Sequence, residues 1–186
     1  MSPRVTLRPA TPGDVPLLRF WDEQPHIQAA DPNDDWQWET ELLRDPPWRE
    51  QLIAELDGRP LGFLQLIDPA LEDGHYWGEV PENLRAVDIW IGLERDLGRG
   101  YGTQMMRQAL ERCFAPPEVV AVLIDPLASN LRAQRFYRRF GFRWVERRRF
   151  GPDDCAVHRL ERADWEARVS SSSWEAGGSS SGETPG

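Results

Sequence analysis

The chain of 186 residues contains no lysine, so all 22 of its basic residues are arginine. This absence excludes the phosphate-binding loop G-x-x-x-x-G-K-[ST], which requires a lysine. Cysteine is scarce too, with only Cys113 and Cys155. Two cysteines are too few for a disulfide scaffold, and we expect both to be free thiols in a reducing compartment. The sequence also lacks an apolar run near the ~20 residues of a membrane span, so we expect no membrane partner.

Positive charge is in short supply relative to negative charge. The 31 acidic residues give a formal net charge of −9 and a pI of about 4.9. This balance argues against nucleic acid as a partner and favours a cationic small molecule. The three histidines share no metal-ligand spacing, so we expect no metal. The first residues, MSPR, lead into a predicted strand instead of a secretory segment, so a cytoplasmic location is expected.

The length suits one domain, which we place at residues 1–168. Alternating or continuous apolar patterns predict strands at 4–8, 50–56, 61–67, 86–93, 119–124, 143–150 and 155–161. Helical periodicity predicts helices from Thr11 to Pro25 and at 36–44, 104–114 and 130–140. The stretches 26–35 and 69–84 are predicted loops, both rich in carboxylates. Residues 169–186 are Ser/Gly-rich and predicted to be a disordered tail.

A glycine-rich turn joins the predicted strand 86–93 to the predicted helix 104–114. Glycines let backbone N–H groups approach a ligand closely, and a helix N-terminus adds unpaired donors and partial positive charge. The turn therefore predicts a cradle for a diphosphate, although a plain helix start fits the pattern equally well. The candidate residues of this cradle are Gly98, Arg99, Gly100, Tyr101, Gly102 and Thr103.

A second stretch, residues 125–142, reads DPLASNLRAQRFYRRFGF. The two stretches together resemble the GCN5-related N-acetyltransferases (GNAT), although Leu97 stands where that family usually has Gln or Arg. The resemblance implies an α/β fold with a mixed central sheet of about six to seven strands. Its central parallel strands would be splayed, and about four helices would flank the sheet. It also implies acetyl-CoA as the cosubstrate, held by the glycine turn.

The same resemblance assigns roles around the thioester. Tyr137 would donate a proton to the departing thiolate, because a phenol stays protonated at neutral pH. The alternative is a packed aromatic ring whose hydroxyl is satisfied elsewhere. Asn130 and Ala133 would flank the pantetheine arm, and a backbone N–H near Trp90 or Ile91 would polarise the thioester oxygen.

A closer resemblance is to the aminoglycoside 6'-N-acetyltransferases, with siderophore-type N-acetyltransferases as relatives. It is carried by segments 15–21, 25–27, 85–88 and 125–142. Asp88 would be the base that acts on the amine, since a carboxylate inside an apolar strand is costly without a task or a partner. A surface-facing or ion-paired Asp88 is the alternative. Asp125 and Asp73 would hold the acceptor, because several carboxylates suit a polyamine.

The acceptor side contains further candidates and departures. His26, Tyr76 and Trp77 are candidate substrate-binding residues, although a lone histidine beside proline is more often structural. This chain has Ala29-Ala30 where the aminoglycoside enzymes have a Trp pair. The carboxylates of residues 31–35 most simply form a solvated face that could attract a cation.

The sequence and these resemblances predict a monomeric or homodimeric acetyltransferase. Its expected reaction is acetylation of a primary amine of a small polycationic acceptor, in the first place the 6'-amine of an aminoglycoside, which would confer antibiotic resistance. Three alternatives stay open: acetylation of another small amine or hydroxylamine, as in siderophore pathways, a non-catalytic acyl-CoA-binding module, and protein acetylation. The two acidic loops disfavour the last, because they would crowd a peptide groove.

Overall fold

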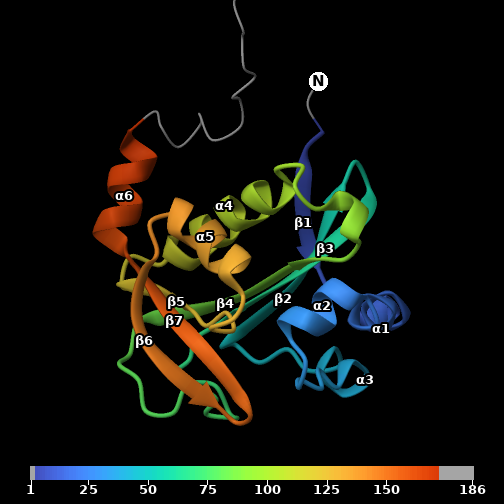
Figure 1. The fold of residues 1–186 in the computed structure, drawn as a ribbon, viewed down its shortest axis with the longest axis horizontal. Coiled ribbons are helices and arrows are strands. Elements are labelled where there is room, and N and C mark those ends of the chain that lie inside the picture. Colours follow the sequence, from blue (N-terminus) through green and yellow to red (C-terminus); the bar gives the residue numbers. More distant parts are fainter. Residues whose placement is uncertain (1–2, 172–186) are drawn as a thin grey trace, which may run out of the picture.

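The computed structural model describes residues 3–171 and contains one seven-stranded sheet in the order β1-β2-β3-β4-β5-β7-β6 (Figure 1). The strands are β1 (Val5–Pro9), β2 (Arg49–Leu56), β3 (Arg59–Ile67), β4 (Leu84–Ile91), β5 (Ala121–Ile124), β6 (Arg143–Phe150) and β7 (Asp153–Glu161). The helices are α1 (Val15–Asp22), α2 (Pro25–Ala30), α3 (Trp38–Glu41), α4 (Tyr101–Phe114), α5 (Leu131–Arg139) and α6 (Arg162–Ser170). The predicted class, a mixed sheet flanked by helices, is confirmed.

The strands β4 and β5 form the parallel pair of this sheet, and they separate early. Their ladder runs only from Leu84↔Ala121 to Ala86↔Leu123. Beyond that point β4 continues to Ile91, still paired with β3 on its other side. The predicted splay of the central strands is therefore confirmed, and it leaves one edge of β4 open to a ligand.

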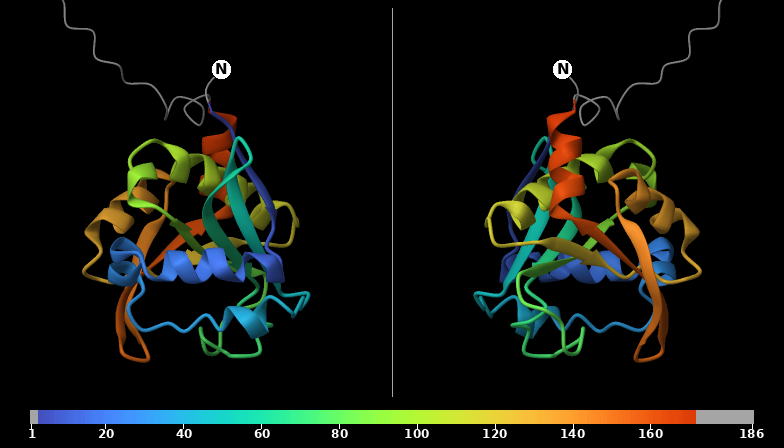
Figure 2. Two further views of the ribbon diagram at one scale, coloured as in Figure 1. Left: turned by 90° about the vertical axis from the view of Figure 1, so that its right-hand side faces the viewer. Right: turned by 90° about the vertical axis from the view of Figure 1, so that its left-hand side faces the viewer.

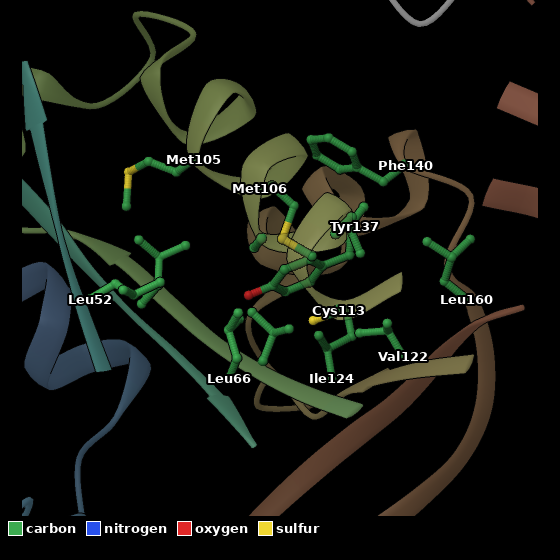
Figure 3. Packing of buried hydrophobic residues seen from close by; sticks show 14 of the residues in the cluster. Leu52, Leu66, Met105, Met106, Cys113, Val122, Ile124, Tyr137, Phe140 and Leu160 are labelled. Carbon is green, nitrogen blue, oxygen red and sulfur yellow. The ribbon is translucent and has the colours of Figure 1, made fainter. Parts of the chain in front are cut away.

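Alternating side chains divide the core between the two faces of the sheet. Leu64 of β3 packs with α4 and α5 in the first cluster, part of which Figure 3 shows. Its neighbour Phe63 packs with α1–α3 on the opposite face. The two further views show these helix groups on either side of the sheet (Figure 2). The far end of that second face is covered by the long loop before β4, which contributes Trp77.

Local signals explain most boundaries. Asp57 and Gly58 both have positive φ, at 51° and 83°, as a tight hairpin turn between β2 and β3 requires. Thr11 and Asp14 form the reciprocal capping box that starts the first helical segment. No helix within residues 3–171 is long and apolar enough to cross a membrane.

Several predicted boundaries differ from the structure by two or three residues, such as the start of α4, and three differ more in kind. Pro25 does not simply end a helix: it occupies the first turn of α2, which fills part of the predicted loop 26–35. The predicted helix 36–44 shrinks to α3, because Gln37 before it is left-handed, with φ 46°. The unpredicted helix α6 includes Val169 and Ser170, so the predicted tail starts too early, and residues 172–186 lie outside the described part.

The sequence does not predict helix α6, because the contacts that hold it are with residues distant in the sequence. Its Trp165 ring stacks on Phe114 of α4, with ring centroids 4.7 Å apart. The guanidinium of Arg162 donates to the carbonyls of Phe114 and Pro116 and so caps the end of α4. No residue of α6 is fully buried, so its sequence carries little amphipathic signal.

Candidate active site

A cavity of about 880 Å³ opens where β4 and β5 diverge. Its walls come from the open edge of β4, the glycine turn before α4, and helix α5. Residues of α2 and of the segment after it form the side opposite α5, together with the start of β7. The splayed strands thus create a space that several segments, distant in sequence, line together.

The glycine turn forms one end of this cavity. Gly98 and Gly100 have φ values of 70° and 79°, and a Cβ added at either would meet nothing within 4 Å. Both glycines line the cavity, as do Gly102 and Thr103 in the first turn of α4. The first helical N–H with a backbone partner is that of Gln104, which donates to the Gly100 carbonyl. The preceding amides are therefore donors for an anion.

Two other predicted cradle residues lie elsewhere. The side chain of Arg99 turns back, and its Nε donates to the Arg95 carbonyl at 2.8 Å. Tyr101 packs, partly buried, against the first core cluster. Neither residue lines the cavity.

The open edge of β4 presents backbone groups to the cavity. The Gly92 N–H donates to the Leu61 carbonyl of β3. Because successive amides of a strand point to opposite edges, the Ile91 N–H and C=O point away from β3. The Ile91 carbonyl accepts a hydrogen bond from His26 Nε2 at 2.8 Å. This geometry makes the Ile91 N–H, rather than that of Trp90, the donor on the cavity side, although both residues line the cavity.

Two carboxyl groups lie at the centre of the cavity. Gln65 Nε2 donates to Asp88 Oδ2 at 3.1 Å. Burial, and secondarily the charge of Asp125, raises the pKa of Asp88 to about 8. Burial also raises the pKa of Asp125 to about 7, against the lowering effect of the Tyr76 hydroxyl, which donates to it at 2.6 Å. These carboxyl groups are therefore poised to bind or exchange protons near neutral pH.

The hydroxyl of Tyr137 faces the same space. Its ring is 8% exposed and packs in the first core cluster (Figure 3). Burial, followed by the charges of Asp88 and Asp125, raises the pKa of Tyr137, so the phenol keeps its proton. On the same helix, Asn130 and Ala133 also line the cavity. The Asn130 side chain caps the helix by accepting from the Ala133 N–H at 3.1 Å.

The structure does not bring two predicted acceptor residues to the cavity. The carboxylate of Asp73 is exposed and forms an ion pair with Arg44 at 2.7 Å. Trp77 is only 3% exposed and packs edge-on against Phe150. Tyr76, their neighbour, does line the cavity, where its ring stacks on Phe150.

Carboxylates of the segment after α2 line the cavity instead. Asp31 accepts a hydrogen bond from Trp36 Nε1 at 2.8 Å. Burial, and then hydrogen bonding to Asp34, raises the pKa of Asp31. Asp34 lies close enough to raise the pKa of both Asp88 and Asp125. The sequence predicts that Asp31 and Asp34 belong to a solvated face that could attract a cation, and it does not predict their place in the cavity, because nothing local in a loop shows which way it folds.

Comparison with known proteins gives one family and consistent relatives. The model of the acetyltransferase (GNAT) domain matches residues 11–150. An aminoglycoside N(6')-acetyltransferase type 1 of Klebsiella pneumoniae is 33% identical over 154 residues, covering 74% of this chain and 73% of that protein. A lysine N-acyltransferase MbtK of Mycolicibacterium paratuberculosis is 27% identical, covering 78% of this chain and 68% of that protein.

A solved structure agrees with these relatives. The aminoglycoside acetyltransferase AAC(6')-Ib, in complex with coenzyme A and kanamycin, superposes with a TM-score of 0.77 at 28% identity. The match covers 89% of this chain and 99% of that one. The relationship therefore extends over nearly the whole described fold.

Proposed function

The chain belongs to the GNAT acetyltransferase family, and on that premise we propose that it transfers the acetyl group of acetyl-CoA to the 6'-amine of an aminoglycoside. The observation that supports this acceptor is the set of five carboxyl groups around one cavity: Asp31, Asp34, Asp88, Asp125 and Asp153. Carboxylates in a partly desolvated site favour a ligand with several ammonium groups. The relatives named above as aminoglycoside acetyltransferases point to the same class.

The residues present fit acetyl-CoA, which supplies an activated acetyl thioester. The free amides of Gly102 and Thr103, with the open Gly98 and Gly100, suit its diphosphate. The Ile91 N–H, on the cavity side of β4, is the donor for the thioester oxygen, where charge develops during acyl transfer. Backbone donors held by a sheet and a helix need little reorganisation, so they are efficient catalysts of this step.

Two side chains handle the protons. We infer that Asp88 Oδ takes a proton from the acceptor ammonium, directly or through a water. A pKa of about 8 makes Asp88 a stronger base than an ordinary aspartate while leaving a usable fraction ionised near neutral pH. The nitrogen then bonds to the acetyl carbon as the C–S bond breaks. Tyr137 Oη would give its proton to the departing thiolate and be reprotonated by the second proton that the nitrogen loses. Its raised pKa keeps that proton in place until the step requires it.

A second candidate acceptor is a single small amine, as the lysine N-acyltransferase relative suggests. One ammonium would leave most of these carboxyl groups unmatched, so the cavity favours the polycation. We also place the enzyme in the cytoplasm, where free Cys113 and Cys155 would stay reduced.

The test is release of free CoA thiol from acetyl-CoA with kanamycin, a polyamine and lysine as separate acceptors. We expect turnover with kanamycin and little with lysine. An aminoglycoside with a hydroxyl in place of the 6'-amine is the matched control and should not be acetylated. Turnover with lysine alone, or equal turnover with the 6'-hydroxyl compound, would contradict the proposal.

A further inference from the structure

Helix α5 carries an unusual concentration of one charge. Four of its residues are arginines, Arg132, Arg135, Arg138 and Arg139, and it contains no carboxylate. All four line the cavity wall. No carboxylate within residues 3–171 forms an ion pair with any of them, whereas arginines such as Arg59 are paired. In a chain with a net charge of −9, this helix is a localised cationic strip.

This arrangement is unfavourable for the helix by itself. Like charges three or four residues apart cost about 0.2–0.5 kcal/mol per pair, and Arg135 has such neighbours on both sides. Arg132 also lies in the first turn, where the helix dipole favours anions, whereas Arg138 and Arg139 lie in the last turn, where it favours cations. An anion bound against the strip would offset both costs. The close spacing of like charges in α5, and the position of Arg132 at its start, therefore point to a ligand rather than to the stability of the helix.

Contacts place the strip beside the glycine turn. A Cβ on Gly102, in the first turn of α4, would lie 3.6 Å from the Phe136 ring. The guanidinium of Arg139 lies over that ring, 5.5 Å from its centroid. One aromatic ring thus separates Arg139 from the cradle. Arg135 lies one helical turn before Arg139, on the same side of α5.

We propose that Arg135 and Arg139, assisted by Arg132, bind the 3'-phosphate of the donor and make the enzyme selective for CoA over 3'-dephospho-CoA. The inference rests on the proposed function. The diphosphate has its own donors in the backbone amides of the glycine turn, so the remaining phosphate monoester is the group left for the strip. Guanidinium groups suit a monoester dianion because their paired N–H donors match its oxygens.

Calorimetric titration of the full chain with CoA and with 3'-dephospho-CoA tests this directly, without an acceptor or turnover. The wild-type chain should bind CoA at least about tenfold more tightly, as expected for lost charge-assisted hydrogen bonds. The double variant R135Q/R139Q should lose that preference. Its affinity for 3'-dephospho-CoA should stay within about threefold of wild type, since the diphosphate site is intact.

Glutamine keeps the helix propensity of arginine, and both residues are exposed, so the variant should fold. The control is R149Q, which removes one exposed arginine of β6 that does not line the cavity and should keep the full preference. Thermal unfolding of both variants checks their folding.

Three results would overturn the inference. Equal binding of both ligands by the wild-type chain would exclude a 3'-phosphate site. If the double variant lost affinity for CoA and for 3'-dephospho-CoA equally, the arginines would contact the diphosphate instead of the 3'-phosphate. If the wild-type chain bound neither ligand, the proposed acetyl-CoA function would fail with it, whereas the first two results would leave that function standing.

Discussion

The carboxyl group of Asp88 should make the empty enzyme less stable, so that D88N gains stability as it loses activity. The native fold holds this carboxyl in a cavity where ionisation is unfavourable, raising its pKa from 3.8 to about 8. Below about pH 4 the group is protonated in both the folded and the unfolded chain. As the pH rises toward 8, the unfolded chain loses the proton first, so the free energy of unfolding falls.

Each unit of pKa shift corresponds to about 1.4 kcal/mol. The cavity opens to solvent, which weakens the effect, so we expect D88N to raise the free energy of unfolding by about 1–3 kcal/mol at pH 8. The gain should vanish near pH 4. For a chain of this length, it corresponds to an increase in Tm of roughly 3–10 °C. The asparagine carbonyl can still accept from Gln65, so no hydrogen bond need be lost.

Urea unfolding of the wild type and D88N across this pH range measures the difference. D73N is the matched control, because its exposed carboxylate lies outside the cavity and should change stability by less than about 0.5 kcal/mol. D88N should also reduce kcat/KM by about 10²–10⁴-fold while binding CoA normally. A stability difference that does not vary with pH, or a loss of stability at pH 8, would refute this account of Asp88.

Three further predictions concern the same cavity. Y137F should lower kcat by about 10–100-fold with little change in the KM for acetyl-CoA, measured by thiol release; an unchanged kcat would remove Tyr137 from the proton transfer. D31N/D34N should raise the KM for kanamycin about tenfold or more and leave that for acetyl-CoA unchanged, whereas D73N should alter neither. A bound polycation favours the ionised form of Asp88 and lowers its pKa, so the acidic limb of kcat should lie at lower pH than that of kcat/KM.

The position of the glycine turn could be predicted from a short local pattern, whereas Asp88 and Tyr137 became candidates for base and acid through the resemblance of segments 85–88 and 125–142 to known enzymes. Glycine is the residue that adopts positive φ most readily, as Gly98 and Gly100 do between β4 and α4. Their place in the sequence therefore indicates a tight turn there without knowledge of the rest of the chain. The structure places Asp88 and Tyr137 in one cavity, as a shared role requires.

The acceptor side could not be predicted in the same way, because it depends on which loops meet. Asp73 has the spacing of a substrate ligand, but Arg44, distant in sequence, holds it in an exposed ion pair. Asp31 and Asp34 look like solvated loop residues until α2 is recognised as a helix, which turns the following segment toward the cavity. Pro25 is the one local signal for α2 in the sequence, since proline is favoured in the first turn of a helix.

Separation of charge along the cavity explains how one acidic protein can hold two highly charged ligands of opposite sign. A donor with several phosphate charges would be repelled by a uniform net charge of −9, and the arginines of α5 offset this locally. The carboxyl groups that line the same cavity attract the acceptor. Asp88, on the open edge of β4, lies where these two regions meet. The carboxylates therefore help to bind the polycation. In its absence, their mutual repulsion adds to burial, the larger cause, in making Asp88 basic enough to accept the proton.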